Sequence, residues 1–279
     1  MYYSVEEIKE TYQRVHDLLV TKYIIKSYST NTEDIRRTAI NDVVLNDYRD
    51  ILELGCGYGF FIEALKGRLH DNATIIGIDL VENNRDVYLQ TIDSIGYRGK
   101  FIKNNVEIIE NYKTSSFDLI VACYSLYFFP QIIDQISRIL KPGGLFIAIT
   151  HSQYSLRELI ILIQECMTEI GFDTPECMSL QGLIKSFSLE NGKDILNPYF
   201  SRIELIEYKN SMIFSYKHVD DCIYYIEKKR QLLYKEVLVS HPEKILDLEI
   251  CLSRKVYEQA KKYNEFIITK DDAIFRCIS

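Results

Sequence analysis

A glycine-rich turn near residue 55 is the part of the sequence with the clearest capacity for ligand chemistry. Residues 51–59 read ILELGCGYG, an apolar strand that turns through alternating glycines into an apolar helix predicted over Phe60–Leu69. Missing side chains let a ligand touch the backbone, and a helix amino terminus adds unpaired amides. The turn therefore predicts a ligand site built from backbone N–H groups, with the acidic Glu53 beside it.

A carboxylate lies at the end of the next predicted strand. Asp79 closes the apolar run Thr74–Asp79 and follows Gly59 by 20 residues. A carboxylate at this place can accept hydrogen bonds from both hydroxyls of an adenosine ribose. The alternative is that Asp79 only caps the segment that follows the strand.

The spacing of the glycines separates two classes of adenosine cofactor. The dinucleotide fingerprint is Gly-x-Gly-x-x-Gly, and its third glycine admits a pyrophosphate and close helix packing. Here Phe60 occupies that third position, and the glycines run Gly-x-Gly-x-Gly behind Glu53. This spacing favours a cofactor that has no pyrophosphate and carries a cationic amino group.

Short β-branched runs alternate with amphipathic stretches over residues 50–170, which is typical of a parallel sheet covered on both faces. The predicted strands are Ile51–Leu54, Thr74–Asp79, Lys100–Lys103, Phe117–Cys123 and Leu145–Thr150. The predicted helices are Phe60–Leu69, Asn83–Ile95, Pro130–Leu140 and Leu156–Ile170. Residues 141–144, Lys-Pro-Gly-Gly, predict a stop and turn before the fifth strand.

The two ends of the chain follow different patterns. Residues 1–45 are predicted to be helical, with Ser4 and Glu7 in capping-box spacing and a second short helix over Glu33–Leu45. Residues 171–198 are irregular and polar. Strands are predicted over Arg202–Tyr216 and Glu265–Cys277, around two helical stretches.

The ordered motifs resemble those of the class I S-adenosylmethionine-dependent methyltransferases, over roughly residues 45–150 and more loosely beyond them. Residues 53–59 are similar to the family's first motif, and Asp79 is similar to its ribose-binding acid. Phe117–Val121 resembles the fourth strand, and Leu140–Gly144 resembles the turn before the fifth. The resemblance implies S-adenosylmethionine as cofactor and S-adenosylhomocysteine as product, and it is silent about the acceptor.

The resemblance also implies positions for the cofactor-binding residues. They are Glu53, Gly55, Cys56, Gly57, Asp79, Leu80, Asn105, Val106, Cys123 and Tyr124. The glycines would line the methionine part, Asp79 would hold the ribose, and Leu80 would pack on the adenine. Asn105 stands where the family often has Asp, although an amide oxygen can also accept from the adenine amino group.

Tyr127 and His151 are candidates for contact with the acceptor. Tyr127 lies in an apolar stretch that follows Cys123 and Tyr124, which match positions that approach the methionine end. His151 follows the fifth predicted strand. For Tyr127 and His151 a catalytic role stands against a packing or structural one, since aromatic residues and a lone histidine at a strand end are often structural.

Together, pattern and resemblance predict an α/β fold. Its core would be a Rossmann-like, doubly wound mixed sheet, mostly parallel with an antiparallel last strand. The expected domains are an N-terminal helical cap over 1–45 and the cofactor-binding core over 46–150. Residues 151–279 would form a helical lid insertion after the fifth strand and the last strands that complete the core sheet.

The composition argues against several classes of protein. A formal charge of −7 disfavours an extended nucleic-acid surface, because such binding relies on Lys and Arg. The seven cysteines lie far apart without metal-ligand spacing, so no metal site is predicted. Residues 1–7 contain no basic leader, and apolar runs such as Leu159–Ile163 are too short to span a bilayer. We therefore expect a cytoplasmic protein that binds no membrane.

The leading hypothesis is methyl transfer to an oxygen or nitrogen of a small-molecule acceptor, by a monomer or homodimer. A sulfonium methyl is already activated, so the reaction needs mainly an in-line nucleophile in a closed pocket. A general base is needed only if the acceptor must lose a proton.

Other activities remain open at this point. The alternatives are methylation of RNA or protein and a non-catalytic cofactor-binding module of the same fold. Methylation of an arsenical at Cys123 is disfavoured, because no other cysteine has a matching spacing.

Overall fold

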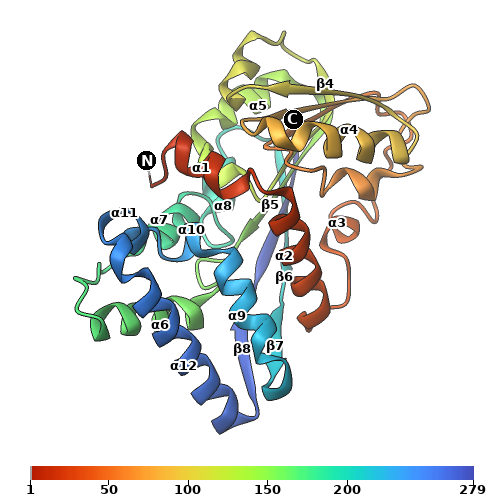
Figure 1. Ribbon diagram of the computed structural model, residues 1–279. Coiled ribbons are helices and arrows are strands. Elements are labelled where there is room, and N and C mark those ends of the chain that lie inside the picture. Colours follow the sequence, from red (N-terminus) through yellow and green to blue (C-terminus); the bar gives the residue numbers. More distant parts are fainter. Residues whose placement is uncertain (1) are drawn as a thin grey trace. The chain divides into compact units, whose positions relative to one another are not determined.

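The computed structural model describes residues 2–279 and divides the chain into two compact units. The first unit combines residues up to 32 with residues 153–184 and 209–271, and the second combines residues 33–152, 185–208 and 272–279 (Figure 1). Each unit is thus built from segments that are far apart in the sequence. The predicted functional division into cap, core and lid remains a prediction.

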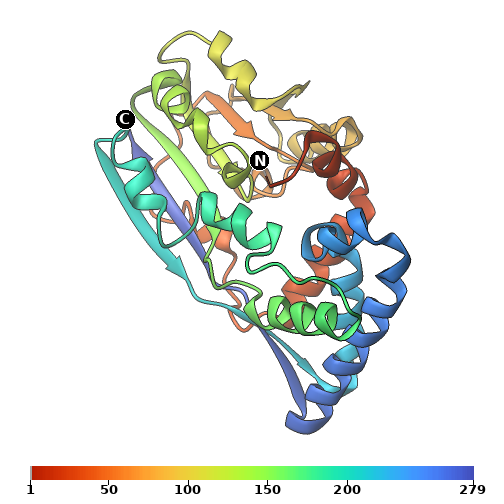
Figure 2. The same ribbon diagram turned by 90° about the vertical axis from the view of Figure 1, so that its left-hand side faces the viewer.

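The second unit is organised around a seven-stranded sheet in the order β3-β2-β1-β4-β5-β9-β6. Its strands are β1 (Asp50–Leu54), β2 (Thr74–Asp79), β3 (Arg98–Lys103), β4 (Phe117–Cys123), β5 (Leu140–His151), β6 (Arg202–Tyr208) and β9 (Asp272–Ile278). The first five pair in parallel, and β9 is antiparallel to both β5 and β6. In Figure 2 the green β5, the violet β9 and the teal β6 lie side by side. The predicted mixed, mostly parallel sheet is confirmed.

Burial on both faces explains the nearly continuous apolar character of the central strands. In β4, Leu119 and Val121 share one core cluster with Ile51 of β1 and Ile75 of β2. Ile120 and Ala122 alternate with them and are also fully buried. The helix α4 (Arg85–Ser94) packs against β3, and α5 (Ile133–Ile139) packs against β5. The sheet is therefore covered on both sides, as the sequence pattern predicts.

Several local predictions were wrong. Residues 60–69 hold only the short 3-10 helix η1 (Ile62–Leu65), because Gly59 and Gly67, with φ of +84° and +66°, place left-handed backbone on either side of it. The predicted turn at 141–144 lies inside β5, as the extra residues between Leu140, which pairs with Phe117, and Leu145, which pairs with Leu119. Residues 171–198 contain α7 (Ser179–Ser186) and α8 (Gly192–Leu196), short helices whose apolar pattern is too brief to predict them.

The other elements of the second unit are short. They are α3 (Ile35–Thr38), η2 (Glu82–Asn84), η3 (Val106–Asn111), η4 (Leu126–Phe128) and η5 (Pro130–Ile132). Asp34 caps α3 by accepting a hydrogen bond from the Arg36 amide. The helix predicted over 33–45 is confined in the structure to the single turn of α3.

The first unit is mainly helical. It contains α1 (Val5–Tyr12), α2 (Val15–Tyr28), α6 (Arg157–Glu169), α9 (Val219–Lys228), α10 (Arg230–Leu233), α11 (Lys235–Ser240), α12 (Ile245–Tyr263), η6 (Tyr216–His218), η7 (Pro242–Lys244) and the strand pair β7 (Ser211–Ser215) and β8 (Glu265–Thr269). The predicted capping box of Ser4 and Glu7 begins α1 and is confirmed.

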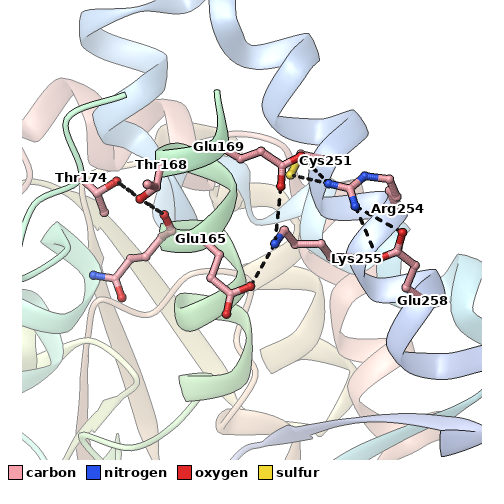
Figure 3. Close-up of polar contacts among 9 residues, drawn as sticks. Glu165, Thr168, Glu169, Thr174, Cys251, Arg254, Lys255 and Glu258 are labelled. Carbon is pink, nitrogen blue, oxygen red and sulfur yellow. Dashed lines mark hydrogen bonds and ion pairs between the residues drawn. The ribbon is translucent and has the colours of Figure 1, made fainter. Parts of the chain in front are cut away.

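Ion pairs and buried side chains join α6 to α12 in this unit. Lys255 of α12 lies 3.1 Å from Glu165 and 3.6 Å from Glu169 of α6, and Arg254 also pairs with Glu169 (Figure 3). Beneath them the two helices share one apolar core. No helix within residues 2–279 combines the length and the apolar character needed to cross a bilayer.

A buried arginine on β9 joins the sheet to the segment that precedes β1. Arg276 is 6% exposed; its Nε donates to the Ala39 carbonyl at 2.9 Å and its Nη2 to the Thr38 carbonyl at 2.8 Å. Its Nη1 lies 3.2 Å from the Glu204 carboxylate of β6. The guanidinium therefore satisfies carbonyls that have no strand partner.

Replacing Arg276 by Met is expected to lower the free energy of unfolding by about 2–3 kcal/mol, because both carbonyls lose a buried donor. Arg202→Met is the matched control, since Arg202 lies exposed on neighbouring β6 and should change stability by less than about 0.5 kcal/mol. Urea denaturation followed by circular dichroism measures both. Equal losses in the two variants would contradict the anchoring role of Arg276.

Candidate functional site

The carboxyl ends of β1 to β5 meet at one edge of the sheet, because these strands are parallel. From β1 the chain proceeds through β2 and β3 to one side, and β4 and β5 lie on the other side. The order therefore reverses between β1 and β4, and open α/β sheets bind ligands at such a reversal. The predicted cofactor residues all lie at this edge, in the last residues of β1, β2 and β4 or directly after β1, β2, β3 and β4.

The glycine turn after β1 has left-handed backbone at its alternating glycines. Gly55, Gly57 and Gly59 have φ values of +63°, +50° and +84°. A Cβ at Gly55 would lie 2.6 Å from the Cβ of Ser125, so packing excludes a side chain there. A Cβ at Gly57 would meet no atom within 4 Å. The backbone at Gly57 thus borders open space that a ligand can enter.

Asp79 joins the end of β2 to this turn. Its Oδ2 accepts a hydrogen bond from the Gly57 amide at 2.8 Å, and its Oδ1 accepts one from the Val81 amide at 2.8 Å. Burial raises the pKa of Asp79, and the hydrogen bonds from these amides offset part of the rise. A carboxylate oxygen can accept more than one hydrogen bond, which suits ribose hydroxyls.

Glu53 is a buried acid beside the turn. It is 2% exposed, and its Oε2 has no hydrogen-bond partner among residues 2–279. Burial raises its pKa, the Asp79 charge adds to the rise, and the nearby Tyr88 hydroxyl offsets part of it. A buried carboxylate oxygen without a donor fits a cationic ligand group such as an ammonium. The residues at this edge therefore fit the amino end of S-adenosylmethionine.

The residues predicted to meet the adenine follow β2 and β3. Leu80 is partly buried directly after Asp79, and Val106 is buried at the start of η3. Asn105 caps η3, because its Oδ1 accepts from the Glu107 amide at 3.3 Å. An amide oxygen has two acceptor positions, so the cap leaves one for a ligand. The contacts of these residues with a base remain predictions.

Cys56 and Cys123 occupy different surroundings at this edge. Cys56 is buried, and burial followed by the charge of Asp79 raises the pKa of its thiol. Its amide, like that of Gly55, donates to the Ile78 carbonyl. Cys123 is partly buried at the end of β4. Cys56 therefore packs beneath the turn, and its backbone holds the turn to β2.

Tyr124, Tyr127 and His151 come together beyond β4 and β5. The Tyr124 ring lies 4.7 Å from the His151 ring at an interplanar angle of 25°, and the Tyr127 ring lies 5.8 Å away at 23°. Tyr124 has a left-handed φ of +53°, which is uncommon for a tyrosine and is found at functional sites. The two candidate catalytic residues are thus neighbours.

Asp272 is the residue of this group that the sequence pattern did not predict. Its Oδ1 lies 2.6 Å from Nδ1 of His151, and its Oδ2 accepts a hydrogen bond from the Tyr124 hydroxyl at 2.8 Å. Burial, with the charge of Asp272 next, raises the pKa of Tyr124. Asp272 lies 121 residues from His151, so only strand pairing brings it here.

Tyr88 was missed for a different reason. It is fully buried on α4, and a Cβ at Gly77 of β2 would lie 2.4 Å from its ring. A glycine in the interior of a strand is a sign of such close approach. Gly77 was thus a usable signal that a bulky group lies against β2 beside Glu53.

A comparison with known families now bears on these observations. Residues 52–148 match a family model described as a methyltransferase domain. The match begins in β1 and ends in β5, and it includes the glycine turn, Asp79 and Tyr124. No curated protein sequence is significantly similar to the chain.

Solved structures share the fold at low sequence identity. The YcgJ protein from Bacillus subtilis is 15% identical, with a TM-score of 0.52 over 88% of this chain and 96% of that one. A methyltransferase-like protein from Bacillus halodurans is 12% identical, with a TM-score of 0.51 over 87% and 97%.

A third similar structure is a complex of phosphoethanolamine N-methyltransferase 2 from Haemonchus contortus. It holds phosphomonomethylethanolamine and S-adenosylhomocysteine, and it is 14% identical with a TM-score of 0.54 over 99% of this chain and 60% of that one. These likenesses agree with the family model, the sheet order and the resemblance of the motifs. Residues 52–148 therefore form a methyltransferase domain, and the chain is an S-adenosylmethionine-dependent methyltransferase.

Proposed function

We propose that the enzyme transfers the methyl group of S-adenosylmethionine to an oxygen or nitrogen of a small molecule. The observation that carries the proposed cofactor site is the buried Glu53 carboxylate, whose Oε2 has no hydrogen-bond donor among residues 2–279. It lies beside the hydrogen bond that the Gly57 amide donates to the Asp79 carboxylate. A cationic amino group and a ribose diol complement these two acids. The sulfonium of the cofactor supplies the activated methyl group.

Each predicted residue has a part in this proposal. Glu53 binds the amino group, and the backbone at Gly55 and Gly57 allows the methionine part to approach. Asp79 accepts hydrogen bonds from the ribose. Leu80 and Val106 supply apolar contact to the adenine, Asn105 accepts from its amino group, and Cys56, Cys123 and Tyr124 border the methionine end.

The small size of the acceptor is supported by charge and by side-chain chemistry. The net charge of −7 opposes an RNA backbone, and the rings of Tyr124, Tyr127 and Phe128 lie beyond the end of β4. The Haemonchus contortus enzyme named above is itself described with a small phosphorylated amine. Methylation of RNA or protein, and binding without turnover, are the competing outcomes of an assay.

A general methylation assay separates these outcomes. The protein is incubated with S-adenosylmethionine and panels of small hydroxyl compounds and amines, with total RNA and with a protein extract, and S-adenosylhomocysteine is quantified. Product with a small molecule supports the proposal. Product with RNA or protein alone contradicts it, as does cofactor binding without any turnover. We also propose a cytoplasmic location and a monomeric or homodimeric state.

Asp79→Asn is expected to weaken the binding of S-adenosylhomocysteine by at least tenfold. Removing the charge costs hydrogen bonds that are worth about 1.5–3 kcal/mol each. Isothermal titration calorimetry measures the affinity, and Asp71→Asn is the control because Asp71 lies exposed in the turn before β2. Unchanged affinity in Asp79→Asn would show that the ribose assignment is wrong.

Glu53→Gln is expected to stabilise the ligand-free protein at neutral pH while it weakens cofactor binding. Folding raises the pKa of Glu53. The contribution of its protonated form to the stability of the folded protein is therefore complete below the unfolded pKa of about 4.3, and this contribution is lost as the pH rises through the folded pKa. Glutamine cannot ionise, and the variant should gain about 1–3 kcal/mol at pH 7 and little at pH 4.

Thermal unfolding from pH 4 to pH 8 measures this difference. Glu110→Gln, a change of an exposed glutamate in the same unit, is the control and should follow the wild type. Parallel curves for wild type and Glu53→Gln would contradict the raised pKa.

A further inference from the structure

We infer that His151 is the general base of the reaction, oriented by Asp272 and Tyr124, and that the acceptor is a hydroxyl compound. The inference rests on the proposed function and deepens it. It assigns a catalytic role to one residue and positioning roles to two others. It also selects one class of acceptor from the two that the proposed function allows.

The register of β5 against β9 creates the pair of His151 and Asp272. His151 is the last residue of β5 and Asp272 is the first residue of β9, and they lie directly opposite each other. Side chains of residues that are directly opposite in an antiparallel pair share one face and lie in contact distance. A short carboxylate therefore reaches the imidazole without any distortion of the sheet.

The hydrogen bonds of Asp272 define the chemistry of the ring. A carboxylate accepts, so the 2.6 Å contact places the imidazole proton on Nδ1 and the lone pair on Nε2. The Tyr124 hydroxyl donates to the other carboxylate oxygen at 2.8 Å. Asp272 is 3% exposed, so it has little solvent to compete with these bonds. This arrangement stabilises the imidazolium that forms when Nε2 accepts a proton.

Aromatic contacts connect His151 to the cofactor turn. The Tyr124 ring, which is stacked on His151, lies 6.4 Å from the Phe60 ring, and Phe60 directly follows Gly59. The Tyr124 amide donates to the Ile149 carbonyl at 2.8 Å, which holds the left-handed residue against β5. The imidazole is thus attached to the same sheet edge as the glycine turn.

The chemistry of a general base favours a hydroxyl acceptor. An amine that is bound in its neutral form attacks with its own lone pair and can lose its proton afterwards, and a carboxylate is already ionised at neutral pH. A phenol, with a pKa near 10, and an alcohol both retain the proton and need a base. As the oxygen–carbon bond forms and the sulfur–carbon bond breaks, the electron pair of that bond stays on sulfur. The hydroxyl proton passes to Nε2 of His151 and later to water.

Several ionisable groups surround the pair of His151 and Asp272 within the second unit. Asp272 contacts the imidazole from β9, and Tyr124 and Tyr127 lie against it from the segment after β4. Cys123 and Tyr208 lie close enough to Tyr124 to affect its pKa. Because these groups surround His151, a pH profile alone does not identify the base, and a direct test of the ring is required.

The first experiment observes the imidazole itself. In the nitrogen NMR spectrum of the wild type with S-adenosylhomocysteine, the signals that are lost in His151→Gln should be those of a neutral ring protonated on Nδ1. Asp272→Asn should change the tautomer or broaden these signals. A ring protonated on Nε2, or a ring unaffected by Asp272→Asn, would overturn the inference.

The second experiment measures transfer to simple phenols, such as catechol, and to primary amines, such as ethanolamine. His151→Gln is expected to lower kcat for the phenol about 100-fold or more, while the affinity for S-adenosylhomocysteine stays within twofold. Added imidazole should restore part of the activity of His151→Ala. Asp272→Asn and Tyr124→Phe should lower kcat for the phenol by a larger factor than they raise the KM for the phenol. His70→Gln is the control, since His70 is a histidine of the same unit that precedes β2.

The outcomes separate this inference from the proposed function. Methylation of amines without methylation of any hydroxyl compound would overturn the inference and leave the proposed function standing. Full activity of His151→Gln on a phenol, or no rescue of His151→Ala by imidazole, would also overturn it. A protein that binds S-adenosylhomocysteine and methylates neither class contradicts the proposed function, and the NMR tautomer then tests the inference by itself.

Discussion

The hydrogen bond between the Asp79 carboxylate and the Gly57 amide is the constraint on which the cofactor edge depends. A partly buried carboxylate is tolerated only where donors surround it, and the donors here are backbone amides of the glycine turn and of the segment after β2. The bond holds the turn at a left-handed conformation that glycine alone adopts easily. Glu53 then lies beside a second negative charge in the same buried cluster, and the space above Gly57 stays open.

The strand ends and the glycine turn of the candidate cofactor site could be predicted from the sequence because their signals are local. The strands Thr74–Asp79 and Phe117–Cys123 have the predicted bounds, since buried parallel strands require continuous apolar runs. The glycines, Asp79 and Asn105 each directly follow such a strand. Local pattern failed at residues 60–69, where the positive φ of Gly59 and Gly67 leaves room for only one turn of helix.

The group around His151 could be predicted only in part, for a physical reason. His151, Tyr124 and Tyr127 follow predicted strands, but Asp272 joins them through the pairing of β5 with β9. Register is specified by which side chains the whole sheet buries, and no short motif encodes it. The cofactor residues are thus encoded near one another in the sequence, while the partner of His151 is encoded in the topology. Substitutions in the returning strand can therefore alter acceptor chemistry without touching the glycine turn.

The position of β9 between β5 and β6 also has a consequence for synthesis of the chain. β5 and β6 leave the ribosome before the strand that pairs with both, and 121 residues separate His151 from Asp272. At about 5–20 residues per second, the edge of β5 waits roughly 6–24 s for its partner during translation. An unpaired apolar strand edge invites pairing with other chains. During synthesis the edge of β5 is therefore exposed to pairing with other chains for longer than the finished sheet suggests.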